Sequence, residues 1–176
     1  MKFTETKFKG AYIIEVEPIK DERGFFARSF CKEEFKKLGL KHEIVQCNVS
    51  YNKKAGTIRG MHFQCEPYGE TKIVSCTKGA IYDVIIDLRE DSETFFKWEA
   101  VELTETNGKR LYIPEGFAHG YQTLENDTLV YYQMGNFYNP AFACGIKFDD
   151  PILAIKWPIE TKIISDKDLC YEAFSL

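Results

Sequence analysis

The chain has 176 residues, a formal net charge of -4 and an aromatic content of 15%. This length predicts a single domain, 1–176, with enough mass for a substantial core. The sequence has no basic stripe and no apolar run of about twenty residues, so we expect neither nucleic acid nor membrane as a partner. The first ten residues lack the apolar core of a signal peptide, so we expect a cytoplasmic protein whose six cysteines stay reduced.

Short apolar and aromatic runs alternate with turn signals along the whole chain, and they predict an all-β sandwich or barrel. The predicted strands lie at 11–18, 24–30, 43–51, 57–64, 72–79, 80–89, 98–104, 110–116, 118–124, 128–135 and 145–150. Residues 31–40 predict a short surface helix, with Gly39 as its C-terminal stop. Residues 104–113 predict a hairpin that turns at Asn107-Gly108.

Strand alternation assigns side chains to faces. Asp83 and Asp87 should share one face of their strand with Ile81 and Ile85. In 128–135, Val130, Tyr132 and Met134 should lie together.

The stretch "RGMHFQ" (59–64) puts Gly60, His62 and Gln64 on one polar face. Strict alternation then points Arg59 away from His62. A bulge or a twist at Gly60 would return it to the same side.

The histidines argue against a metal centre. His42, His62 and His119 are far apart in the sequence, and no H-x-H or C-x-x-C spacing occurs. We therefore expect no metal and no cofactor. His62 is then either a hydrogen-bonded core histidine or a general base, because its side chain is suited to proton transfer near neutral pH.

Other candidates have equally ordinary interpretations when taken singly. Asp166 and Asp168 in "SDKD" fit a helix-capping turn, and the sequence alone brings neither to His62. Lys72 fits an edge-strand lysine that reaches water, or a cation facing an anionic oxygen. Tyr132 fits a structural tyrosine, and His119 fits a polar residue in a loop-to-strand passage.

Taken together and in this order, these stretches are distinctive. "DERGFF", "VQCNVS", "GTIRGMHFQ", "ETKIVSCTKGAIYDVIIDLR", "LYIPEGFAHGYQTL", "VYYQMGNFYNP", "DDPILAIKWP" and "SDKD" span nearly the whole chain. In these motifs the chain closely resembles the dTDP-4-dehydrorhamnose 3,5-epimerase family. The resemblance implies a cupin-type β jelly roll with a few short peripheral helices. It also implies a homodimer that exchanges N-terminal strands and uses no metal.

The resemblance also implies a role for each matching residue. His62 matches the catalytic base, Asp168 its carboxylate partner, and Tyr132 the proton donor on the opposite face of the sugar. Lys72 matches the residue near the 4-keto oxygen. The positions that match substrate contacts are Arg23, Arg28, Gln46, Asn48, Arg59, His119, Tyr138 and Lys167. The implied partner is a nucleotide-linked 4-keto-6-deoxy sugar, some of whose contacts cross the dimer.

Three positions depart from the family pattern. Arg28 stands where the family usually has Glu, Cys47 where it has Asp, and Ala143 where it has an acidic residue. All three lose negative charge at positions that the resemblance assigns to the nucleotide. We therefore expect the dTDP-linked sugar to be a poor substrate, and a GDP- or CDP-linked sugar to be a better one.

Two other functions stay open on the sequence. One is a 3,4-ketoisomerase acting on the same substrate class, and the other is a non-catalytic sugar-nucleotide binding module. Tyr132 and the pair of His62 and Asp168 favour epimerisation over the ketoisomerase. The presence of His62, Lys72 and Tyr132 argues against the binding module. The sequence leaves open whether carbons 3 and 5 both invert.

Overall fold

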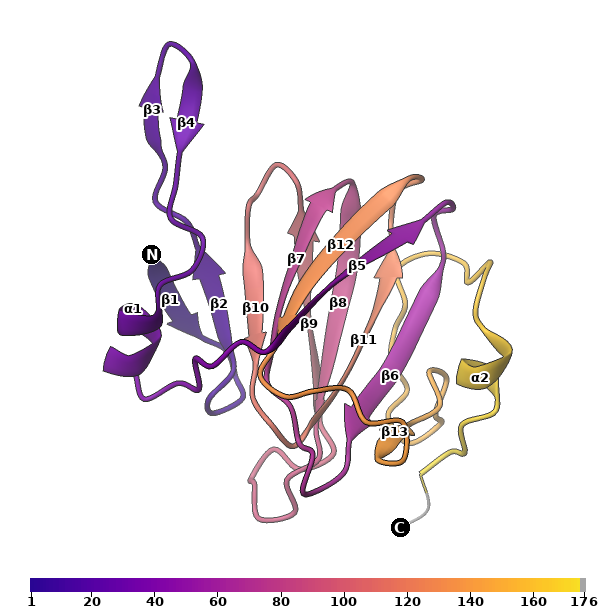
Figure 1. Cartoon of the computed structure of the whole chain (residues 1–176). Coiled ribbons are helices and arrows are strands. Elements are labelled where there is room, and N and C mark those ends of the chain that lie inside the picture. The colour runs from indigo at the N-terminus through magenta and orange to yellow at the C-terminus, as the bar shows by residue number, and fades with distance from the viewer. Residues whose placement is uncertain (175–176) are drawn as a thin grey trace.

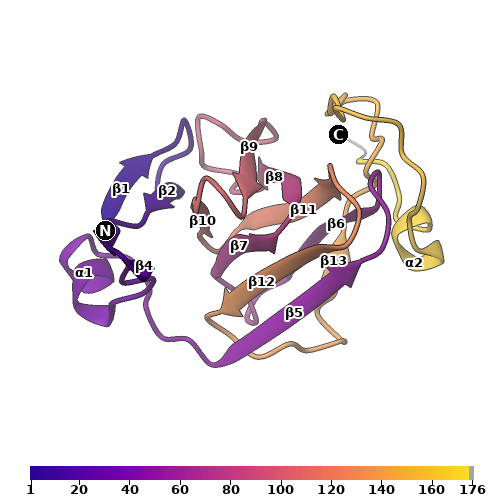
Figure 2. The same ribbon diagram turned by 90° about the horizontal axis from the view of Figure 1, so that it is seen from above.

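In a computed structural model, which describes residues 1–174, the chain folds into two facing β-sheets (Figure 1). One sheet has six strands in the order β1-β2-β10-β7-β12-β5, and the other has five in the order β13-β6-β11-β8-β9. The view from above shows the two layers, with α1 and α2 on opposite flanks (Figure 2). The predicted all-β architecture with short peripheral helices is confirmed.

The element bounds follow the predicted runs closely in the middle of the chain. The strands are β1 (Lys2–Glu5), β2 (Tyr12–Glu15), β3 (Ile19–Asp21), β4 (Gly24–Phe26), β5 (Gln46–Asn52), β6 (Ile58–Gln64), β7 (Lys72–Lys78), β8 (Ala80–Asp87), β9 (Trp98–Thr104), β10 (Arg110–Ile113), β11 (Phe117–Thr123), β12 (Thr128–Met134) and β13 (Ala143–Gly145). The helices are α1 (Lys32–Lys37) and α2 (Asp166–Leu169). Neither helix is long enough to cross a bilayer.

The main core lies between the sheets, and β8 contributes to it with the two isoleucines that alternation places on one face. Ile81 and Ile85 pack there with Val74 and Val130 from the facing sheet. On the other face of β8, Val84 and its neighbours pack against the segment that follows β13. Both faces of β8 are therefore buried. Close packing on both faces holds this strand, and the side chains it carries, in fixed positions.

Several local predictions differ from the structure. The turn at Asn107-Gly108 does not join a hairpin, because β9 pairs with β8 while β10 pairs with β2 and β7. The chain changes sheet at this turn. β1 and β3 were not predicted, and their exposed, charged sequences give little periodic signal. Of the strand predicted at 145–150 only Gly145 lies in a strand, because the chain turns where the Asp150 N–H donates to the Lys147 carbonyl at 3.2 Å.

The C-terminal segment returns to β6 and positions α2. Thr57 bridges Ile163, and the Ile58 N–H donates to the Ile163 carbonyl at 2.8 Å. Gly56 permits this approach, since a Cβ atom there would lie 2.5 Å from the Glu160 carbonyl oxygen. Residues more than a hundred positions apart thus become neighbours beside β6.

Candidate active site

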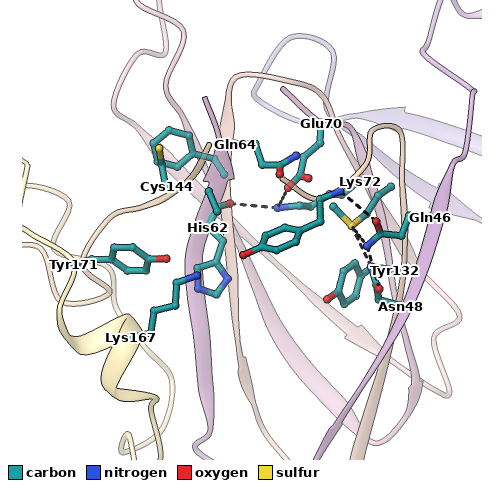
Figure 3. Close-up of a pocket in the computed structure, with 14 residues that line it drawn as sticks. Gln46, Asn48, His62, Gln64, Glu70, Lys72, Tyr132, Cys144, Lys167 and Tyr171 are labelled. Carbon is teal, nitrogen blue, oxygen red and sulfur yellow. Dashed lines mark hydrogen bonds and ion pairs between the residues drawn. The ribbon is translucent and has the colours of Figure 1, made fainter. Parts of the chain in front are cut away.

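Two adjoining hollows open between the sheets, and they share the side chains of His62, Lys72 and Tyr132. Figure 3 draws the residues that line the larger one. The larger has a volume of about 340 Å³ and the smaller about 150 Å³. His62 comes from β6 in the five-stranded sheet, whereas Tyr132 comes from β12 in the six-stranded sheet. These two side chains therefore approach the shared space from opposite walls.

His62 forms a pair with Asp168, the residue that the sequence alone could not bring to it. Nε2 of His62 lies 2.7 Å from Oδ1 of Asp168, and the Gly60 N–H donates to Oδ2 at 3.3 Å. Ser165 caps α2 by accepting from the Asp168 N–H at 3.1 Å. Burial alone would raise the pKa of Asp168, but the hydrogen bond and charge of His62, with the Gly60 and Ser165 contacts, lower it. Asp168 therefore stays ionised and can hold an imidazolium.

A bulge in β6 brings Arg59 to the same side as His62. His119 pairs with His62 and Tyr121 with Arg59, so β6 has two residues where β11 has only Gly120. Arg59 and His62 both line the smaller hollow, and Arg59 Nε donates to Asn52 Oδ1 at 2.8 Å. The strict alternation that pointed Arg59 away is wrong here, because the extra residue reverses the phase of the strand.

The backbones of the two strands almost touch at this bulge. A Cβ atom on Gly60 would lie 2.5 Å from the Gly120 Cα, and Gly60 has a φ of +141°. Glycine is therefore required at both positions.

Lys72 is a buried cation and not an edge-strand lysine. Its strand, β7, lies between β10 and β12, and its side chain is only 8% exposed. Its ammonium lies 2.8 Å from Glu70 Oε1 and donates to the His62 carbonyl at 3.3 Å. A cation fixed beside the His62 strand can stabilise negative charge that develops in the hollow.

Tyr132 presents its phenol to the same space. Burial raises its pKa; the positive charge of Arg59 opposes that rise, and the negative charge of Glu70 adds to it. The phenol is thus protonated at neutral pH and available as a proton donor.

The whole chain matches one family of known proteins. The model of the dTDP-4-dehydrorhamnose 3,5-epimerase family matches residues 5–175. The chain is 40% identical to the dTDP-4-dehydrorhamnose 3,5-epimerase of Shigella flexneri over 175 residues, covering 99% of this chain and 96% of the relative. The chain belongs to this epimerase family. It is an isomerase of deoxysugar biosynthesis, as the resemblance implied.

Two solved structures of family members are similar to this epimerase throughout. The Bacillus anthracis enzyme with TDP and pyrophosphate bound has a TM-score of 0.95 and 44% identity, covering 98% of this chain and 99% of that one. The Legionella pneumophila enzyme, in complex with dTDP-4-keto-L-rhamnose, has a TM-score of 0.91 and 35% identity, covering 98% and 92%. The cupin-type jelly roll is therefore confirmed, and a nucleotide sugar is the substrate class.

Most substrate-binding positions inferred from the resemblance line the hollows of this epimerase. Gln46, Asn48, Tyr138 and Lys167 line the larger hollow, and His119 the smaller. The Gln46 amide nitrogen donates to Asn48 Oδ1 at 3.3 Å and to the Met134 sulfur, and the Asn48 amide nitrogen donates to the same sulfur. Sulfur is a weak acceptor, so these donors are readily available to a ligand.

Arg23 and Arg28 lie outside both hollows. Arg23 is at the exposed tip of the β3–β4 hairpin, paired with Asp21, and Arg28 pairs with Glu34 at 3.1 Å. Within one chain, neither could contact a ligand held in the hollows.

The three departures from the family pattern do not act together within one chain. Ala143 lines the larger hollow, whereas Arg28 does not. Cys47 is exposed and alternates with the hollow-lining Gln46 and Asn48, so its side chain leaves the opposite face of β5. Within one chain the three changes therefore do not meet at one hollow, and their effect on the nucleotide stays a prediction.

Sequence reasoning missed Glu70, Asp83 and Tyr171. Asp83 Oδ1 accepts from His119 Nε2 at 2.7 Å in a second buried His–Asp pair. An acidic residue on the same face of β8 as Ile81 and Ile85 was its signal. Tyr171 lines the larger hollow and meets the His62 ring edge-on at 5.9 Å. Glu70 could also have been found from the sequence, because alternation puts it on the same face of the strand as Lys72.

The cysteines differ from expectation at one pair. Cys65, just after β6, and Cys144, in β13, form a disulfide beside the larger hollow. The prediction that all six stay reduced is wrong for this pair. In the described chain the remaining cysteines are free thiols.

Proposed function

We propose that this enzyme inverts carbons 3 and 5 of a dTDP-linked 4-keto-6-deoxy sugar, with His62 as base and Tyr132 as acid. The observation that carries this proposal is the approach of these two side chains to one hollow from opposite sheets. Inversion needs proton removal on one face of the sugar and proton return on the other. Neither a ketone transfer nor simple binding requires that arrangement.

The 4-keto group acidifies the hydrogens on carbons 3 and 5. With its Nε2 proton donated to Asp168, His62 keeps a lone pair on Nδ1 and takes the carbon-bound proton there. The electron pair of the broken C–H bond forms an enolate, whose negative charge lies on the C4 oxygen. The Lys72 ammonium stabilises this charge.

The Tyr132 hydroxyl then donates its proton to the opposite face of the same carbon, which restores the ketone with inverted configuration. The turnover leaves His62 protonated and Tyr132 ionised, and exchange with solvent resets both groups. Asp168 holds the intermediate imidazolium. All steps of this reaction use only side chains of the protein.

The proposed nucleotide is dTDP. The names of the relatives support this choice, and Cys47, one of the three departures from the family pattern, leaves the face of β5 opposite to the hollow. A panel of dTDP-, CDP- and GDP-linked 4-keto sugars tests it directly. Specificity constants that favour a GDP- or CDP-linked sugar would reject dTDP and restore the earlier expectation.

We further propose that two copies pair through the β3–β4 hairpin. Ile19, Phe25 and Phe26 on this arm are 71%, 69% and 74% exposed, an unusual exposure for large apolar side chains. Figure 1 shows the arm projecting from the body of the molecule. An arm that reaches a partner would bury these residues and bring Arg23 toward the partner's hollow. Light scattering of the purified protein should give twice the chain mass, and a monomer would reject the pairing.

The test of the reaction is solvent exchange. In deuterium oxide, the wild-type protein should introduce deuterium at carbons 3 and 5 of the dTDP-linked sugar and yield the inverted product. His62→Ala should reduce exchange roughly a hundredfold to ten-thousandfold. A shifted ketone would indicate an isomerase, absence of exchange would indicate a binding module, and full activity of His62→Ala would reject the base.

A further inference from the structure

Glu70 carries an oxygen that the described protein leaves unsatisfied. Oε1 lies 2.8 Å from the Lys72 ammonium, but Oε2 has no hydrogen-bond partner within residues 1–174. The Glu70 side chain is only 7% exposed and forms part of the wall of the larger hollow (Figure 3). A buried carboxylate oxygen without a hydrogen-bond donor is unfavourable, so a donor is expected at this position.

Neighbouring donors are already engaged elsewhere. The Gln64 amide donates to the carbonyls of Tyr68 at 3.0 Å and Phe137 at 3.2 Å. Lys72 donates to Oε1 and to the His62 carbonyl. A molecule bound in the hollow is therefore well placed to supply the donor.

We propose that Glu70 Oε2 accepts a hydrogen bond from the C3 hydroxyl of the substrate and makes the enzyme selective for sugars that carry it. This inference rests on the proposed function, in which Lys72 faces the C4 oxygen. Lys72 contacts Oε1 of Glu70 and, in the proposed function, the C4 oxygen of the sugar. Oε2 of the same carboxylate therefore lies close to a carbon next to C4. Of the two carbons next to the ketone, C3 carries a hydroxyl donor, whereas C5 carries a methyl group and the ring oxygen.

The charge of Glu70 is consistent with this role. Its carboxylate is paired with Lys72, so the hollow gains an acceptor without an isolated buried charge. Burial is the main cause of the raised pKa of Tyr132, and the negative charge of Glu70 also contributes to it. One side chain thus accepts a substrate hydroxyl and helps to keep the donor phenol protonated.

Two substrates and two enzymes test the inference. The dTDP-linked 4-keto-6-deoxy sugar and its analogue without the C3 hydroxyl both retain the C5 hydrogen, so deuterium entry at C5 can be compared. Wild-type kcat/KM should favour the hydroxylated sugar roughly tenfold to a hundredfold, the range of a charge-assisted hydrogen bond. Glu70→Ala should abolish most of this preference, because only the hydroxylated sugar loses a contact.

The ratio of kcat/KM for the two sugars separates a binding role of Glu70 from a structural one. A merely structural role for Glu70 would lower both rates together and leave the preference unchanged, which would overturn the inference. Glu70→Gln keeps the side-chain volume and an acceptor without the charge, so its preference should be intermediate, and it carries the test if Glu70→Ala unfolds. Glu66→Ala, an exposed position in the same loop, should behave as wild type.

The outcomes also distinguish this inference from the function on which it rests. Equal wild-type exchange at C5 of both sugars would refute the role of Glu70 alone. No wild-type exchange with either sugar would refute the epimerase mechanism and, with it, the role of Glu70.

Discussion

Replacing Asp168 by Asn tests how the tautomer of His62 is set. The Asp168 carboxylate can only accept, so His62 Nε2 carries a proton across the 2.7 Å contact and Nδ1 keeps its lone pair. The other carboxylate oxygen accepts from the Gly60 N–H. Asparagine retains the Gly60 contact only when its oxygen occupies that position, and this orientation turns its NH₂ group toward His62.

The NH₂ group then donates to Nε2, and the imidazole proton moves to Nδ1. In that tautomer His62 cannot accept a proton from carbon at Nδ1. The imidazolium also loses the charge that stabilises it. Removal of a general base typically costs about a hundredfold to ten-thousandfold, and the same Asp-to-Asn change in a serine protease triad costs about 10⁴. We therefore expect exchange at carbons 3 and 5 to fall roughly a thousandfold to ten-thousandfold.

Deuterium entry at the two carbons, followed by NMR, measures this loss. Asp166→Asn is the matched control, because Asp166 is exposed on the same short helix and should leave exchange unchanged. Thermal unfolding should report a folded Asp168→Asn protein, since the two side chains have the same shape. A folded Asp168→Asn variant with near-wild-type exchange would refute the tautomer argument.

Three further predictions concern the acid, the absence of a metal and stability. Tyr132→Phe should still admit deuterium into recovered substrate while the epimer yield falls; equal loss of exchange and inversion would indicate a binding role. Prolonged chelation should leave activity unchanged, since His, Cys, Asp and Glu within residues 1–174 form no group of three that could hold a metal; activity that depends on stoichiometric metal would contradict this. Burial alone would raise the pKa of Asp87, but hydrogen bonds from Arg89, Ser92 and Thr94 hold it at about 2. This value is below the unfolded pKa of about 4, so the stabilisation is present above pH 4 and is lost as the pH falls towards 2. Asp87→Asn should therefore lower the free energy of unfolding at pH 7 by about 2 kcal/mol and differ little from wild type near pH 2; a difference independent of pH would argue against this account.

Local sequence determined most of the strands and indicated which side chains are candidates for the proposed reaction. Period-two alternation in β8 and β12 correctly grouped Ile81 with Ile85 and Val130 with Tyr132, because the pleat fixes side-chain direction without reference to the rest of the chain. His62, Lys72 and Tyr132 were recognisable as candidates from residue type. Their roles came from the family resemblance, and no local pattern assigned them.

Tertiary structure decided which of these residues meet. Asp168 reaches His62 because the C-terminal segment packs beside Gly56, and alternation carries no information about a contact at that separation. Arg59 turns inward because β6 bulges where two glycines bring the strands together, and this register depends on the partner strand. Local sequence describes a strand's own geometry, whereas contacts, register and burial depend on what packs against it.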